Sequence, residues 1–229
     1  MTGGHEGTRR VVRVACHWLV LFGGALFLLG GCTEEILRKP GVDPTGTVPS
    51  DKTETQLLAE LDRKFENPGA HYELARLYHQ SQQWTKAEYR YNVALGFDPA
   101  HRAAQAGLVK MFADRGETAK TEQYANGYIR QAAPFVTETL RLGWEFEKLN
   151  LDAYAERCFR QALDRAPDSD EANKQTGFYY LGKGDSVKAK QYLLRSFELN
   201  PRQADVANAL GRLGVVVETP PPPEMTMEK

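Results

Sequence analysis

Apolar residues recur three and four positions apart along the chain from residue 53 to about residue 213. This spacing places them on one face of an α-helix. No run in this region alternates apolar and polar positions as a half-buried strand does. The pattern therefore predicts an all-α fold without a sheet.

The helical pattern repeats every 34 residues. Pro99, Pro167 and Pro201 are separated by two periods and by one. An aromatic side chain fills one column in every unit: Tyr78, Phe112, Phe146 and Tyr180. A small side chain fills another column in three of the units: Ala87, Ala155 and Ala189. The prolines predict where the second helix of each unit ends, because proline cannot continue a helix.

A further column predicts the end of the first helix of each unit. Its members are Gln82, Gly116, Asn150 and Gly184. Glycine and asparagine tolerate the left-handed backbone conformation that often follows a helix. Each unit is therefore expected to be two helices joined by a tight turn.

The unit resembles the tetratricopeptide repeat (TPR). The resemblance rests on Leu74-Ala75-x-x-Tyr78 followed by Ala87, Tyr91, Ala94 and Pro99, and the third and fourth units carry the same pattern. It implies a TPR helical-hairpin solenoid of four repeats, at 68–101, 102–135, 136–169 and 170–203. In the second unit Val109 and Thr121 stand where small residues are expected, so this unit should be the least regular or the place where the stack bends.

Repeat stacks need capping helices at both ends, since a terminal repeat would otherwise expose its apolar face. Thr53 and Gln56 have the spacing of a capping box, and apolar residues follow them at helical spacing. We assign residues 53–67 to an N-terminal capping helix. Residues 204–217 are assigned to a C-terminal capping helix, and residues 218–229, with Pro220–Pro223, to a proline-rich disordered tail.

The N-terminal segment resembles the signal peptide of bacterial lipoproteins. Three arginines precede the apolar run 18–29, which is too short to span a bilayer, and Leu29-Gly30-Gly31-Cys32 follows. The resemblance implies that residues 1–31 are removed and that Cys32 is lipidated, with residues 32–52 as a flexible tether. Thr33, in place of aspartate, favours the outer membrane, facing the periplasm. The alternatives are a plain cleaved signal peptide or an uncleaved anchor.

Composition and charge narrow the classes of function. Hydrophobic residues make up 41% of the chain and charged residues 26%, which is ordinary for a folded protein. Removal of residues 1–31 takes three of the 29 basic residues and one of the 30 acidic residues, leaving a formal charge of −3. Nucleic acid is not an expected partner, because phosphate binding needs a clustered basic excess.

The residue types that carry catalysis are sparse. His71, His79 and His101 lack the spacing of a helical metal site and are expected on the surface. Cys158 lies between Arg157 and Phe159, so it is either a packed thiol or one made reactive by neighbouring arginines. We expect no enzyme, no cofactor and no metal.

In the resembled family, first-helix residues that point away from the packing stripe line a groove for a protein or peptide segment. Carrying those columns over gives Tyr72, Arg76, His79, Lys110, Asp114, Leu140, Trp144, Glu147, Lys148, Lys174, Phe178 and Leu181. Four of them should form an exposed apolar patch: Leu140, Trp144, Phe178 and Leu181. The alternative is that the C-terminal capping helix covers Phe178 and Leu181.

These features together suggest a membrane-anchored, protein-binding scaffold of the bacterial cell envelope. Such a protein would assist assembly of a pilus, secretion or outer-membrane complex. The alternative is a regulator or docking subunit of an envelope enzyme, for example one of cell-wall metabolism.

Overall fold

The computed structural model describes residues 52–218, which form ten α-helices and no strand. This confirms the all-α fold class predicted from the 34-residue pattern. The proposed signal peptide, Cys32, the rest of the tether up to residue 51, and the tail from residue 219 lie outside the described residues. None of the described helices is both long and apolar enough to cross a membrane.

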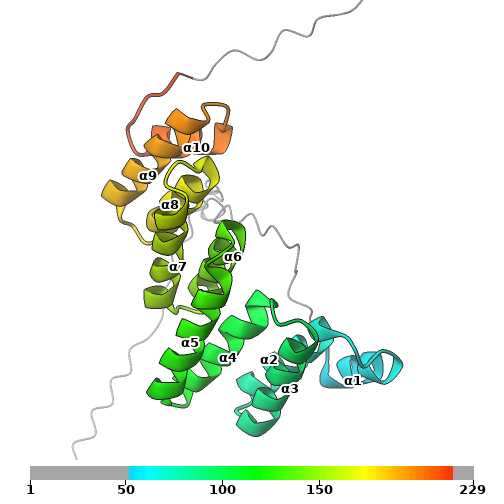
Figure 1. Ribbon diagram of the computed structural model, residues 1–229. Helices are drawn as coiled ribbons and strands as arrows, with labels where there is room; N and C mark the ends of the chain where they lie inside the picture. Colours follow the sequence, from blue (N-terminus) through cyan, green and yellow to red (C-terminus); the bar gives the residue numbers. More distant parts are fainter. Residues whose placement is uncertain (1–51, 219–229) are drawn as a thin grey trace, which may run out of the picture. The chain divides into compact units, whose positions relative to one another are not determined.

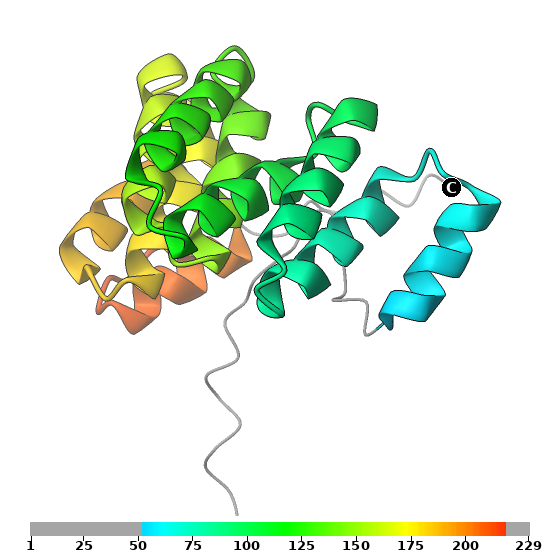
Figure 2. The same ribbon diagram turned by 90° about the horizontal axis from the view of Figure 1, so that it is seen from below.

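Eight of the helices form four consecutive pairs, one pair per 34-residue unit, and a single helix flanks them at each end (Figures 1 and 2). Each helix packs against the next one along the chain, and first helices of neighbouring units also touch. In chain order the helices are α1 (Glu54–Arg63), α2 (Pro68–Gln80), α3 (Trp84–Phe97), α4 (Arg102–Asp114), α5 (Thr118–Ala132), α6 (Val136–Lys148), α7 (Asp152–Arg165), α8 (Asp170–Gly182), α9 (Ser186–Leu199) and α10 (Ala204–Arg212).

The turn inside each pair has the same backbone geometry in all four units. The predicted column is left-handed throughout, with φ of 57° at Gln82, 73° at Gly116, 57° at Asn150 and 78° at Gly184. The next residue donates its N–H to the carbonyl of the aromatic column, as in Gln83 to Tyr78, at 2.8 Å. This bond closes the end of the first helix and reverses the chain.

The two helices of a pair cross closely where the first helix carries a glycine. A Cβ added to Gly177 would lie 2.7 Å from Leu193 Cγ and 3.1 Å from the Leu193 backbone nitrogen. A Cβ on Gly143 would lie 3.1 Å from Cys158 Cβ. In the second unit, Val109 and Thr121 are buried in the same columns, and α4 and α5 pack less extensively than the other pairs. This unit is the least regular, as predicted.

The helix ends follow the sequence signals. Thr53 and Gln56 form the reciprocal capping box at the start of α1. Helices α3, α7 and α9 each end two residues before a proline, at Phe97, Arg165 and Leu199. Proline restricts the residue before it to extended conformations, so the helix ends before that residue.

The buried apolar residues form a core along the stack. One cluster joins α1 to α4, a second joins α4 to α8, and Tyr124 packs against both. A third cluster joins α9 to α10 and includes Leu193, Phe197 and Leu210. The last helix therefore covers the apolar end of the fourth unit.

Candidate functional site

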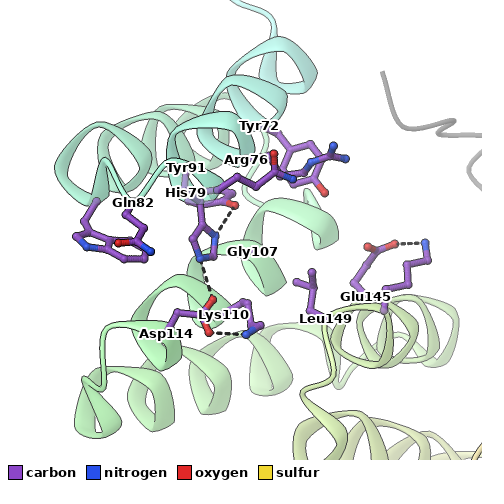
Figure 3. A pocket seen from close by; sticks show the side chains of 13 residues that line it. Tyr72, Arg76, His79, Gln82, Tyr91, Gly107, Lys110, Asp114, Glu145 and Leu149 are labelled. Carbon is purple, nitrogen blue, oxygen red and sulfur yellow. Dashed lines mark hydrogen bonds and ion pairs between the residues drawn. The ribbon is translucent and has the colours of Figure 1, made fainter. Parts of the chain in front are cut away.

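The first helices of three successive units line one groove, with a volume of about 740 Å³ (Figure 3). Six residues predicted to line a groove come together here: Tyr72, Arg76, His79, Lys110, Asp114 and Lys148. The other lining residues were not predicted from the sequence; they are Gln80, Gln82, Trp84, Tyr91, Gly107, Glu145 and Leu149.

A chain of hydrogen bonds connects three helices in the groove. His79 on α2 donates from Nε2 to Asp114 Oδ2 on α4 at 3.0 Å. Its Nδ1 lies 3.4 Å from the hydroxyl of Tyr91 on α3, and the Lys110 ammonium donates to the other Asp114 oxygen (Figure 3). Burial lowers the pKa of His79, while Asp114 acts in the opposite direction. The chain fixes the relative positions of α2, α3 and α4.

The floor of the groove depends on one glycine. Tyr91 is 1% exposed, and a Cβ added to Gly107 would lie 2.7 Å from the Tyr91 ring. The corresponding residues in the other units are large and polar: Glu73, Arg141 and Gln175. A glycine in the middle of a helical pattern was the signal that could have identified this position, because such a glycine usually has a packing reason.

Tyr72 on the groove wall also contacts the residue that precedes α4. Tyr72 lies beside His101, with ring centroids 5.1 Å apart. Burial, assisted by the negative charge of Glu145, raises the pKa of Tyr72 to about 12. Its hydroxyl is therefore neutral at physiological pH and available as a hydrogen-bond donor.

The three basic side chains of the groove are each paired within their own helix. The pairs are Arg76 with Glu73 (3.5 Å), Lys110 with Asp114, and Lys148 with Glu145 (2.9 Å). Partly exposed pairs of this kind contribute little to stability, about 0–1 kcal/mol each. The cations and carboxylates can therefore exchange their partners for charged groups of a ligand at small cost.

The prediction of an exposed apolar patch is wrong. Leu140 is 5% exposed and belongs to the core cluster with Ala106 and Val109. Phe178 and Leu181 pack against the cluster formed by α9 and α10, as the alternative prediction had it. An apolar face at the end of a repeat stack is covered by the cap because its exposure to water is unfavourable.

Trp144 is half-buried but does not line the groove. Its ring packs edge-on against Phe159 at 5.2 Å, and its Nε1 donates to Gln175 Oε1 at 2.6 Å. Lys174, which pairs with Glu171 on α8, is also absent from the groove lining. Trp144 therefore connects the third and fourth units.

The prediction that the histidines lie on the surface is wrong for His71. His71 is 0% exposed; its Nε2 donates to the Phe65 carbonyl at 2.9 Å, and Arg90 donates to its Nδ1 at 3.2 Å. His101 is half-buried and accepts from the Ala104 N–H at the start of α4. A histidine with both ring nitrogens satisfied can be buried in its neutral form.

Cys158 is a packed thiol, fully buried between α6 and α7. Burial raises its pKa to about 12, and this outweighs the opposite effect of Arg157. Within residues 52–218, no group of three or more histidine, cysteine, aspartate or glutamate side chains is placed to hold a metal ion.

Comparison with known proteins returns structures of TPR proteins. No protein-family model and no curated protein matches the chain. YrrB, described as a TPR protein with an unusual peptide-binding site, is 18% identical over 69% of this chain and 81% of its own, with a TM-score of 0.36. TTC0263 from Thermus thermophilus is 18% identical over 69% and 87%, with a TM-score of 0.40. MamA is 16% identical over 66% and 88%, with a TM-score of 0.35.

The described residues form an all-helical stack of TPR-type hairpins, on the ground of their own 34-residue register, turns and crossings. Similarities as weak as those above bear on neither ligand nor partner.

Proposed function

We propose that this protein is a binding scaffold that holds a polypeptide segment of a partner protein in the groove formed by α2, α4 and α6. The observation that carries the proposal is the composition of that groove. The aromatic rings of Tyr72 and Trp84 lie beside ion pairs that can exchange partners, and the buried Tyr91 forms the floor beneath them. Aromatic and basic side chains of this kind dominate many protein interfaces.

The groove favours a segment that combines apolar side chains with carboxylates. Its basic members, Arg76, Lys110 and Lys148, lie on three different helices, so they can contact carboxylates along an extended segment. Asp114 and Glu145 would then pair with basic groups of the same segment. Mixed charges of this kind determine the register of the bound segment and the choice of partner more than they raise the binding affinity.

We further propose that the scaffold is lipid-anchored through Cys32 in the bacterial envelope, at the outer membrane and facing the periplasm. The motif Leu29-Gly30-Gly31-Cys32 supports the anchor, because it resembles the end of a bacterial lipoprotein signal peptide. Thr33, in place of aspartate, supports the outer membrane. The partner would then be a component of a pilus, secretion or outer-membrane complex. A docking role on an envelope enzyme uses the same groove, and the identity of the partner separates the two.

Site-directed photo-crosslinking in cells tests the groove. A photoreactive residue at position 110 should yield a discrete crosslinked partner, whereas the same residue at position 160, exposed on α7 outside the groove, should not. Lys110→Glu should then lower the affinity for the purified partner by about tenfold or more, and Arg160→Glu should leave this affinity unchanged. Equal crosslinking from both positions would refute the groove as the working surface.

Metabolic labelling with palmitate tests the anchor independently. The parent chain should incorporate label and Cys32→Ala should not, because the thioether needs the thiol. Undiminished labelling of Cys32→Ala would refute lipidation at this residue and leave the groove proposal standing.

A further inference from the structure

Helix α3 carries apolar side chains on two opposite faces. Ala87, Tyr91 and Ala94 face the core. Tyr89, Val93 and Phe97 follow one another at intervals of four residues, which places them together on another face. Tyr89 is 56% and Phe97 42% exposed, and Val93 is half-buried. An apolar second face on a surface helix needs an explanation, since such a helix usually turns polar residues to water.

The packing of the repeats does not explain this face. The corresponding positions of the other second helices are almost all polar or glycine: Gln123, Gly127 and Gln131 on α5, Arg157, Gln161 and Arg165 on α7, and Gln191, Arg195 and Leu199 on α9. Apart from Leu199, the same hairpin is built in those units without apolar side chains at these positions. The hairpin architecture therefore does not require apolar residues on this face, although Phe97 also stacks on the buried His71 ring at 5.9 Å.

A fourth exposed ring extends the α3 face. Phe65, between α1 and α2, is 53% exposed. Its ring lies edge-on to Phe97 at 5.8 Å and to His71 at 4.9 Å. We call Phe65, Tyr89, Val93 and Phe97 together the aromatic stripe.

Basic side chains border the aromatic stripe. The Arg90 guanidinium lies 5.5 Å from the Tyr89 ring, and it also holds His71. Lys86 and Arg90 line a shallow surface depression with Tyr78, Thr85 and Tyr89, with a volume of about 430 Å³. Two cations beside exposed rings match a phosphate headgroup next to the boundary of an acyl layer.

We infer that the aromatic stripe rests on an anionic phospholipid surface. Tyrosine and phenylalanine at a membrane interface bury their rings at the level of the headgroups, while cations bind the phosphates. Two copies of the stripe face to face would bring Lys86 and Arg90 of both copies together, which disfavours a second copy as the occupant.

The position of the aromatic stripe in the chain supports a phospholipid surface as its occupant. This step rests on the lipid anchor proposed above. Only 19 residues separate Cys32 from Lys52, which precedes α1. Even fully extended they span no more than about 70 Å. A tether this short keeps the domain at a high effective concentration near the bilayer, on the order of millimolar, so weak contacts at the stripe suffice to orient it.

Vesicle co-sedimentation tests the inference on the mature chain carrying Cys32→Ala, which has no acyl chain to mask other contacts. Vesicles contain phosphatidylethanolamine with phosphatidylglycerol, or phosphatidylcholine alone. The parent should bind the anionic vesicles. The double variant Phe65→Ser/Tyr89→Ser should lose at least about tenfold in partitioning, because two rings no longer enter the interface. Phe135→Ser is the control, since Phe135 is 64% exposed elsewhere on the chain.

A second pair of variants tests the contribution of charge. Lys86→Gln should weaken binding to the anionic vesicles only, and added salt should remove the difference. Its matched control is Lys120→Gln, one repeat further along, where the ammonium lies 5.0 Å from the Phe112 ring in the same way that Lys86 lies 5.1 Å from Tyr78. Equal losses in both variants would contradict a specific role of Lys86.

The outcomes separate this inference from the proposed function. Arg76→Glu in the groove should leave vesicle binding intact, and Phe65→Ser/Tyr89→Ser should leave crosslinking from position 110 intact. The inference is overturned if the parent does not bind the anionic vesicles, or if the double variant binds them as strongly as the parent does. So does concentration-dependent self-association that the double variant abolishes, because the occupant is then a second copy. Unchanged circular dichroism and unfolding midpoints establish that the variants are folded.

Discussion

Single residues at the four turns show how far one backbone requirement can be met by different side chains. Gly116 and Gly184 adopt the left-handed conformation without a Cβ, whereas Gln82 and Asn150 adopt it with one. The left-handed region costs a residue with a Cβ about 1–2 kcal/mol, and asparagine reduces part of this cost with its short polar side chain. Gln82 is therefore the most strained of the four.

We predict that Gln82→Gly raises the free energy of unfolding by about 0.5–1 kcal/mol, because glycine relieves the strain at this turn. Urea denaturation measures the change. Gln123→Gly, at an exposed position inside α5, is the control and should lower stability by a similar amount. A loss of stability in Gln82→Gly would contradict the left-handed assignment.

The helix crossing in the fourth unit permits a test with one methyl group. Gly177→Ala should destabilise the protein by about 1–3 kcal/mol, because the new Cβ meets the Leu193 side chain and backbone nitrogen. Gly182→Ala on the same helix should be neutral or stabilising, since no atom lies within 4 Å of its added Cβ. Similar unfolding midpoints for the two variants would show that the crossing is looser than described.

The buried histidine makes stability depend on pH. Burial lowers the pKa of His71 below its ordinary 6.5, and the Arg90 guanidinium acts in the same direction. A group whose pKa is lower in the folded state binds protons more readily in the unfolded state. Its contribution is complete above pH 6.5 and is lost as the pH falls through the folded-state pKa.

We therefore predict that the unfolding free energy falls between pH 7 and pH 5, and that His71→Gln makes this fall shallower. The pKa values of His79 and His101 are also lowered by burial, so the slope should decrease without vanishing. Denaturation at several pH values gives the slope, and a proton NMR titration assigns the His71 pKa. An unchanged slope in His71→Gln, or a His71 pKa above 6.5, would contradict the account.

At the scale of helices, the sequence predicted every element but only part of the site. The 34-residue register fixes which face of each helix packs inside its own hairpin. It does not fix how neighbouring hairpins meet. The column of Tyr72, Ala106, Leu140 and Lys174 lies at that boundary. Ala106 and Leu140 are buried there, whereas Tyr72 and Lys174 are partly exposed. The difference depends on side-chain length and on contacts between units, which a register alone does not contain.

The same limit applies to Trp144, which the sequence placed in a groove. Because its ring and its Nε1 both contact neighbours, we predict that Trp144→Ala lowers the unfolding free energy by about 2 kcal/mol or more. Lys148→Ala, on the exposed side of α6, should change it by less than about 0.5 kcal/mol. Partner crosslinking from position 110 should survive Trp144→Ala at temperatures where the variant is folded; its loss there would return Trp144 to the binding surface.

At the scale of the described chain, stability is expected to be a sum of units and of contacts between neighbours. Removal of all residues after Gln203 should expose Leu193, Phe197, Phe178 and Leu181 together. We predict that amide hydrogen exchange then accelerates in α8 and α9 and stays unchanged in α2 and α3. Removal of residues 219–229 alone is the control and should alter neither region. Uniform acceleration along the chain would indicate one cooperative unit.

Because each repeat unit packs mainly against the neighbouring units, the stack has a defined response to mechanical load. A pull between the two ends of the stack passes through every hairpin in series, so the least extensively packed pair, α4 and α5, yields first. Each hairpin that opens releases 34 residues, or roughly 110 Å of extended chain, while the others stay folded. If one end is fixed to a membrane and the other to an assembling complex, the stack becomes a spacer that lengthens in steps instead of releasing its cargo.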